Sequence, residues 1–149
     1  MTTPAQIIDW ISCQRGVCID RTGFYGAQAP DLVNDYAAEL YGLHHIFGHG
    51  KDVAGNLAHS HGWEAIGPDQ HAQFGDVFST GPYSPHEPYG YCGVVVEDLH
   101  DGLVVFAQNA HGTGRDPARV QLVSRASGIG GARPPIRFWP RPPRRRLIR

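Results

Sequence analysis

Ala29 stands at the start of a predicted helix, a position where a reactive side chain could do chemistry. Pro30 suits the first helical position, where its missing N–H has no partner to lose. After it, apolar residues recur at helical spacing as far as Tyr41 and predict one buried face. Ala29 therefore lies at the cap, where unpaired N–H groups and the helix dipole would favour ionisation of a cysteine thiol. A cysteine there would be a nucleophile, but this chain has alanine.

The segment around Ala29 is similar to a known motif. It reads DRTGFYGAQAPDL and resembles the nucleophile motif of the CHAP family, the cysteine- and histidine-dependent amidohydrolases/peptidases of bacteriophage endolysins and bacterial wall hydrolases. The matching positions are Asp20, Gly23, Tyr25, Gly26, Gln28, Asp31 and Leu32. Two positions depart from the family pattern: Thr22 replaces the usual second aspartate, and Ala29 replaces the nucleophilic cysteine.

The resemblance also implies where the other catalytic roles fall. The family histidine follows a Pro-Tyr-Gly-like turn and begins a Gly-Val-Val strand, which is the position of Tyr91. The acid that orients this histidine stands two residues before an asparagine, which places it at Ala107, before Asn109. Gln28 is retained and is implied as an oxyanion-hole donor. Alanine supplies neither nucleophile nor acid, and tyrosine, with a pKa of about 10, is a poor base. The resemblance therefore implies a chain that is inactive as written.

The origin of these replacements stays open between a natural pseudoenzyme and deliberate inactivation. Cys92, which follows Tyr91 directly, is the candidate for a relocated nucleophile. If Tyr91 points into a groove, Cys92 points to the opposite face of the strand, so a core thiol is predicted. The other two cysteines, Cys13 and Cys18, complete an odd count that gives no disulfide framework.

The sequence suggests two candidate metal sites, a calcium loop before Ala29 and a site built on the histidines. Related domains often bind Ca²⁺ in the loop before the nucleophile, and the resemblance assigns Asp20, Thr22 and Asp31 to that loop. A neutral threonine removes one negative ligand, so calcium binding is expected to be weak or absent and no cofactor is required. The nine histidines suggest a metal-binding module as a rival, but their spacing fits no known zinc pattern.

The order of predicted elements gives the fold class. Helices are predicted from Pro4 to before Gly16, from Pro30 to Gly42, and over residues 51–58. Extended or strand segments follow at residues 62–66, 77–78, 93–97, 103–108, 120–123 and 136–139. Helices followed by antiparallel strands indicate an α+β fold. The resemblance covers about residues 7–141 and implies a papain-like (NlpC/P60-type) CHAP domain over 1–141, with helices packed on an antiparallel sheet.

The net charge of −1 conceals an uneven distribution. Residues 1–132 hold six basic and fourteen acidic side chains, whereas residues from Arg133 onward hold seven arginines and no acid. The body is therefore not a nucleic-acid binder by charge. The Arg/Pro-rich tail over 142–149 is either a solvated end or a segment that binds anionic wall polymers or membrane electrostatically. The N-terminus lacks signal-peptide features, so we expect a monomeric, phage-encoded cytoplasmic protein released to the wall by a holin, or a virion-associated one.

The implied reaction is hydrolysis of an amide bond in peptidoglycan, either in the stem peptide or cross-bridge or between muramic acid and alanine. Peptidoglycan is the expected partner. The first rival is a natural pseudoenzyme that serves as a wall-binding or phage structural module, and the second is the histidine-based metal-binding module.

Overall fold

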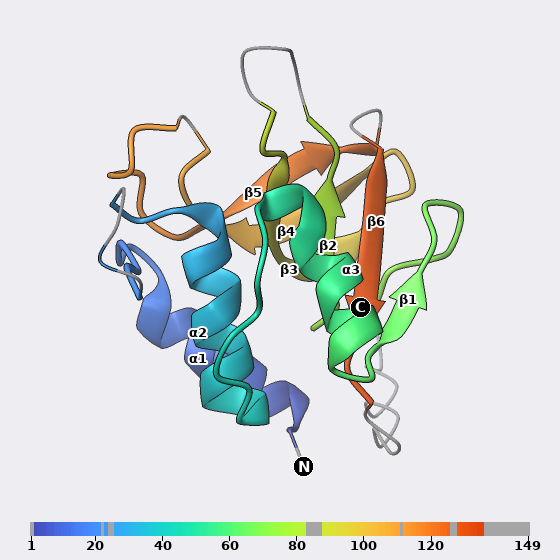
Figure 1. Cartoon of the computed structure of the whole chain (residues 1–149), viewed down its shortest axis with the longest axis horizontal. Helices are drawn as coiled ribbons and strands as arrows, with labels where there is room; N and C mark the ends of the chain where they lie inside the picture. Colours follow the sequence, from blue (N-terminus) through green and yellow to red (C-terminus); the bar gives the residue numbers. More distant parts are fainter. Residues whose placement is uncertain are drawn as a thin grey trace, which may run out of the picture.

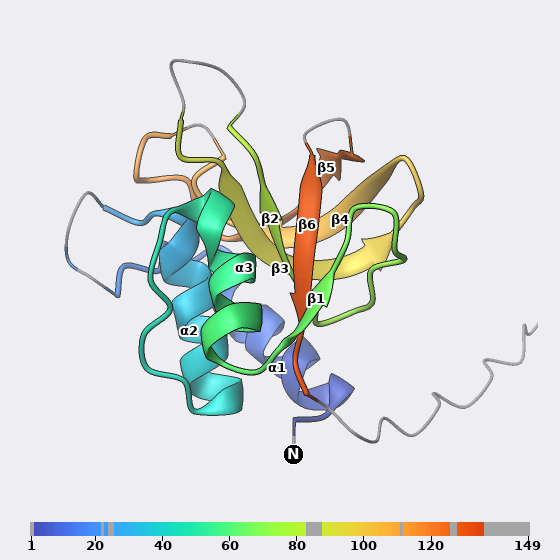
Figure 2. The same cartoon turned by 45° about the vertical axis from the view of Figure 1, so that its right-hand side comes forward.

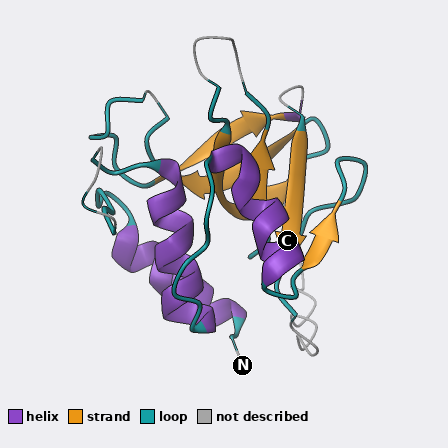
Figure 3. Ribbon diagram, in the orientation of Figure 1, coloured by secondary structure: helices purple, strands orange, loops and turns teal. Residues whose placement is uncertain are grey.

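A computed structural model describes residues 2–21, 23, 26–82, 88–110, 112–125 and 128–135. Three helices come first in the chain and pack on a six-stranded antiparallel sheet (Figure 1). Figures 2 and 3 show the three helices gathered on one side of the strands. This confirms the predicted α+β class with N-terminal helices on an antiparallel sheet. Within the described residues, no helix has both the length and the apolar character needed to cross a bilayer.

The helix boundaries follow capping signals. Helix α1 (Pro4–Gln14) begins at Thr3, whose hydroxyl accepts from the Gln6 N–H at 3.3 Å while the Gln6 side chain accepts from the Thr3 N–H at 2.8 Å. This reciprocal pair satisfies two of the N–H groups that a helix start leaves free. Helix α2 (Ala29–Tyr41) ends at Gly42, which adopts a left-handed φ of 68°. Helix α3 (Gly50–Ser60) matches the third predicted helix.

The start of α2 differs by one residue from the prediction. Gln28 is the N-cap, with extended φ and ψ, and Ala29 is the first helical residue. Pro30 is therefore second rather than first, a position where a missing N–H is equally harmless. The prediction that Ala29 stands at the helix start still holds.

The sheet order is β1-β6-β2-β3-β4-β5. The strands are β1 (Glu64–Ile66), β2 (Val77–Thr80), β3 (Tyr91–Asp98), β4 (Gly102–Ala107), β5 (Arg119–Ser124) and β6 (Ile129–Arg133). Strand β6 was missed from the sequence because two glycines interrupt its five residues. It lies between β1 and β2 and pairs with both. The strand predicted over 136–139 lies outside the described residues.

Strand register separates the side chains of the sheet into two faces. Phe106 contacts Trp10 of α1 with ring centroids 5.4 Å apart, and the Ser79 hydroxyl accepts from the Ala54 N–H of α3 at 2.9 Å. Cys92 pairs with Ser79, so its side chain shares this helix-covered face. Its neighbour Tyr91 points to the opposite face because successive side chains alternate.

Candidate functional site

A buried glutamine joins the start of α2 to the end of β4. The Gln108 side chain has no solvent exposure. Its Oε1 accepts from the Ile19 N–H at 2.9 Å, and its Nε2 donates to the carbonyls of Ile19 and Gln28, each at 2.7 Å. These bonds fix the chain before the helix against the sheet. Ala29, the residue after Gln28, is thereby held at the same end of the sheet as Ala107.

Gln28 and Asn109, both predicted site residues, are in direct contact. The Asn109 Nδ2 donates to the Gln28 Oε1 at 3.1 Å, and the Asn109 Oδ1 accepts from the Gly114 N–H at 2.8 Å. Asn109 adopts a left-handed φ of 62°, which asparagine tolerates better than most residues. The bond to Asn109 orients the Gln28 amide. Its use as an oxyanion-hole donor stays a prediction.

The positions of the implied histidine and acid lie close together on the sheet face opposite the helices. The Gln121 Nε2, on β5, donates to the Tyr91 hydroxyl at 3.0 Å and to the Ala107 carbonyl at 3.1 Å. Gly93 provides the room, because a Cβ there would lie 2.7 Å from the Ala107 Cβ. The Phe78 ring packs edge-on against the Tyr91 ring, with the two ring centroids 6.1 Å apart. Gln121 thus bridges the two positions.

Gln121 was not found from the sequence. It stands in a strand whose neighbours, Val120 and Leu122, carry the β signal. Nothing in its spacing marks it as a partner of Tyr91, since the two are thirty residues apart. The register of β4 with β5, in which Val105 opposes Gln121, is what brings it to the site.

The three positions that the resemblance assigns to the nucleophile, the histidine and the acid are closed to solvent. Ala29 retains 6% exposure, Tyr91 7% and Ala107 none. All three belong to one cluster of buried apolar side chains. Ala29 lies at the start of α2, whereas Tyr91 and Ala107 lie on the sheet face opposite the helices. None of the three provides an exposed nucleophile, base or acid.

Cys92 is a core thiol, as predicted. Its side chain is fully buried against the helices. Burial raises the pKa of the Cys92 thiol far above its ordinary value, and the nearby charge of Asp31 raises it further. Because the thiolate is the nucleophilic form, this environment opposes a relocated nucleophile. Cys13 and Cys18, by contrast, are exposed.

The residues of the implied calcium loop have other tasks in the fold. The Asp20 Oδ1 accepts from the Gly23 N–H at 2.8 Å. The Asp31 Oδ2 accepts from the Gln28 N–H at 3.0 Å, and its carboxylate is buried at the start of α2. Thr22 lies outside the described residues. The structure groups no three His, Cys, Asp or Glu side chains as metal ligands within the residues it describes. Weak calcium binding remains a prediction.

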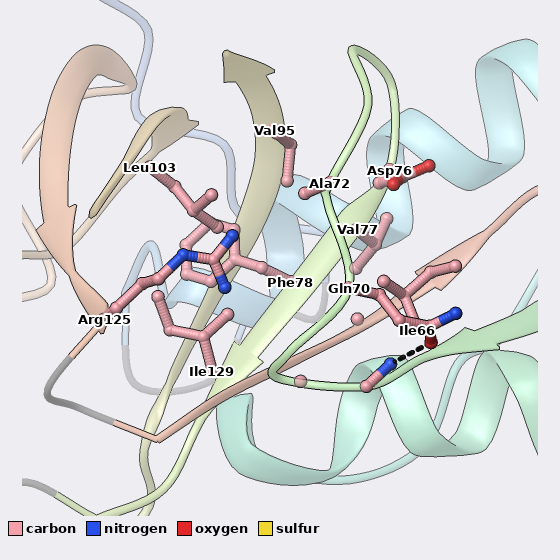
Figure 4. A pocket seen from close by; sticks show the side chains of 13 residues that line it. Ile66, Gln70, Ala72, Asp76, Val77, Phe78, Val95, Leu103, Arg125 and Ile129 are labelled. Carbon is pink, nitrogen blue, oxygen red and sulfur yellow. Dashed lines mark hydrogen bonds between the residues drawn. The ribbon is translucent and has the colours of Figure 1, made fainter. Parts of the chain in front are cut away.

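A pocket lies on the same sheet face as Tyr91 but toward the other end of the strands (Figure 4). Its walls are mostly apolar and come from five strands and the segments beside them. The side chains drawn include Ile66, Phe78, Val95, Leu103 and Ile129, with Arg125 beside them. No residue of the implied catalytic set lines this pocket.

Charged pairs secure the end of the sheet near this pocket. The Asp98 carboxylate accepts from the Ala72 N–H at 2.8 Å and the His100 N–H at 2.9 Å, forms an ion pair with Arg125, and lies 3.4 Å from the His71 Nδ1. Burial acts to raise the pKa of Asp98, but the two backbone hydrogen bonds and the Arg125 guanidinium outweigh it and hold the pKa below its ordinary value. Asp98 is therefore charged in the folded protein.

At the same end of the sheet, the carboxylate of Asp76 has a raised pKa instead of a lowered one. The Arg133 Nε and Nη2 donate to the two oxygens of Asp76, each at 3.0 Å. Burial nevertheless raises the pKa of Asp76, because it outweighs the hydrogen bonds from Arg133 and from the Gln73 N–H. The pair closes β6 against the start of β2.

The fold is similar to those of two solved proteins, one of which is an endolysin. A wild-type endolysin, LysIME-EF1, aligns with a TM-score of 0.75 and 22% identity over 92% of this chain and 66% of its own. Ly7917, alone or with the hydrolyzing product of MDP, aligns with a TM-score of 0.63 and 18% identity over 89% of this chain and 63% of its own. This chain therefore spans just under two thirds of their length.

The sequence matches no protein-family model and no curated protein. The structural likeness establishes the fold, and three helices on this six-stranded sheet fit the papain-like fold that was predicted.

Proposed function

We propose that this chain is a CHAP-type domain of peptidoglycan-hydrolase ancestry that binds bacterial cell wall and is catalytically inactive as written. The observation that carries the proposal is the contrast between lost chemistry and retained scaffold. The nucleophile, histidine and acid positions hold Ala29, Tyr91 and Ala107, all buried. The hydrogen bonds of Gln28, Gln108 and Asn109 nevertheless connect the helix start to the strand end.

Several features support the ancestry. The motif over residues 20–32 resembles the family's nucleophile motif, and Ala29 stands at the helix start where an ionised thiol would gain from the dipole. Tyr91 and Ala107 lie together on one face, as a histidine and the acid that orients it require. The endolysin fold of LysIME-EF1 is similar over nearly the whole chain. Peptidoglycan, the substrate class of such enzymes, is therefore the proposed ligand.

The inactivity follows from the side chains present. Hydrolysis of an amide needs a nucleophile and a group that protonates the leaving amine. The Tyr91 hydroxyl is held by Gln121 inside the core, and Ala29 has no reactive atom. Cys92 is buried on the helix-covered face with a raised pKa. The chain as written is thus expected to release neither peptide nor amine from walls.

The test is stepwise reversion of the three positions. Purified walls from several Gram-positive hosts are incubated with the unmodified chain, with Ala29→Cys, with Ala29→Cys/Tyr91→His, and with the triple variant that adds Ala107→Glu. We expect no turnover from the first, little from the second, measurable turnover from the third and more from the fourth. The gains should be far from additive, because these groups act as one unit. Turbidity loss and new amine release are the readouts.

Two outcomes would contradict the proposal. Amine release by the unmodified chain above background would show that the catalytic residues lie elsewhere, and Cys92→Ala would then show whether that thiol is involved. A chain that neither sediments with walls nor gains activity in a well-folded triple variant would refute the wall-directed assignment. A triple variant that is inert although the chain sediments with walls would favour the natural pseudoenzyme.

The arginine-rich tail belongs to the same proposal. Its charge, opposite to that of the acidic body, would attract anionic wall polymers or membrane. Such an attraction should weaken as salt rises, because exposed charges are screened.

A further inference from the structure

Four exposed rings lie on two neighbouring segments: His45, Phe47 and His49 on the loop between α2 and α3, and Tyr89 just before β3. His45 and Phe47 stack with centroids 5.7 Å apart and an interplanar angle of 13°. His49 and Tyr89 are in contact at 4.6 Å, tilted by 44°. Phe47 is 75% exposed and Tyr89 55% exposed, so both present ring surface to solvent. We call these four rings the aromatic loop surface.

The loop that carries three of these rings is fixed in place. Ile46 is buried, and the Asn34 side chain bonds both sides of it, accepting from its N–H at 2.9 Å and donating to its carbonyl at 3.3 Å. The Asn56 Nδ2 donates to the Phe47 carbonyl at 2.6 Å. Helices α2 and α3 thus hold the loop from two sides. The exposure of Phe47 is therefore built into the structure and does not arise from a loosely held segment.

The aromatic loop surface borders the position of the implied histidine. The connection between α2 and α3 returns along α2 to the end of the molecule where α2 begins (Figures 1 and 2). The Lys51 N–H donates to the Tyr89 carbonyl at 2.9 Å. Gly50 packs directly on the backbone of Tyr91: a Cβ added at Gly50 would lie only 2.8 Å from the Tyr91 Cα. The rings of His49 and Tyr89 therefore lie next to the backbone of Tyr91.

We propose that the aromatic loop surface binds the glycan strand of the cell wall. A pyranose ring presents an apolar C–H face, which stacks on an aromatic face, and a rim of hydroxyls. The imidazoles of His45 and His49 supply nitrogen donors and acceptors for such hydroxyls next to the apolar rings. This inference rests on the proposed function, since it names the wall component that the domain contacts and the residues that contact it.

The test uses a peptide-free probe, a soluble tetramer of β-1,4-linked N-acetylglucosamine. Calorimetric titration of the full chain should give saturable binding. Phe47→Ala and Tyr89→Ala should each weaken it about tenfold, as expected for loss of one ring contact. Leu122→Ala is the matched control, because Leu122 is also a large, exposed apolar side chain (68%) but lies on the edge strand β5 and not among the four rings. The affinity of Leu122→Ala for the tetramer should equal that of the unmodified chain. Equal affinity of all variants, or no binding at all, would overturn the proposal.

A parallel sedimentation with purified walls separates this inference from the proposed function. If the chain binds walls and Phe47→Ala binds them equally well, the aromatic loop surface does not bind the glycan strand, and the proposed wall-directed function stands. If sugar binding depends on Phe47 but the chain does not sediment with walls, the surface is right and the proposed function fails. Circular dichroism of Phe47→Ala should match that of the unmodified chain, because the ring is mostly outside the core.

Discussion

The two ends of the sheet are held together by different chemistry. At the end where β3 begins and β4 finishes, the bonds that join separate segments come largely from neutral amides, those of Gln28, Gln108, Asn109 and Gln121. At the opposite end, Asp98 pairs with Arg125, and Asp76 pairs with Arg133. The first end is the one where the proposed ancestor carried its ionisable catalytic groups.

The difference shows that the chemistry of a site and its mechanical support are separable. On the proposed ancestry, the side chains at positions 29, 91 and 107 could change without loss of the fold, because Gln108 and Asn109 bond backbone and amide groups that do not depend on them. The amide end holds together in the same way over a wide pH range. The charged end depends on ionisation and should respond to acid.

The largest effect should come from Gln108→Ala. This change removes three buried hydrogen bonds, leaves their Ile19 and Gln28 partners unsatisfied, and creates a cavity. We expect a loss of about 4 kcal/mol in the free energy of unfolding, measured by urea denaturation. Gln73→Ala, at an exposed glutamine, is the control and should change little. A loss at Gln108 no larger than that of the control would show that the amide network does not hold the two segments together.

Asp98→Ala should cost somewhat less at neutral pH, about 3 kcal/mol, because it removes the carboxylate paired with Arg125 and the acceptor of the Ala72 and His100 N–H groups. The pKa of Asp98 lies below its unfolded value of about 3.9. Its stabilising contribution is therefore complete above that value and is lost as pH falls through the folded pKa. Urea midpoints taken from neutral pH down to strongly acidic pH should converge for Asp98→Ala and the unmodified chain. Parallel curves would contradict the assignment.

Tyr91→Phe should have the smallest effect. It removes the hydroxyl that accepts from Gln121 but keeps the ring contact with Phe78, and Gln121 retains the Ala107 carbonyl. We expect a loss of about 1 kcal/mol in thermal or urea unfolding. A much larger loss would mean that the Tyr91 hydroxyl is a main support of the amide end.

Most of the fold could be predicted because its signals are local. Thr3-Pro4 and Pro30 mark helix starts, Gly42 marks a helix end, and the run from Gly93 predicts a strand with a hairpin partner. Strand β6 could not be predicted in the same way. Its sequence, IGGAR, has little intrinsic strand preference, and the strand exists because β1 and β2 leave a place between them.

The site was predictable only where the family motif provided positions. Gln28 and Asn109 were predicted as site residues, and the structure places them in contact. Gln108 stands inside the same short motif, but its role as a buried link to Ile19 depends on a contact across 89 residues. Gln121 depends on the pairing of β5 with β4. Contacts of this kind are set by tertiary packing and leave no spacing in the sequence.

The place of β6 bears on how the protein is synthesised. Strand β1 is synthesised before the rest of the sheet, yet its described pairing is with β6 alone, whose residues come more than sixty positions later. Strand β2 likewise keeps one edge unpaired until β6 arrives. The nascent chain therefore carries open strand edges until residues 129–133 have been made, and an unfinished sheet with open edges is prone to pair with another chain.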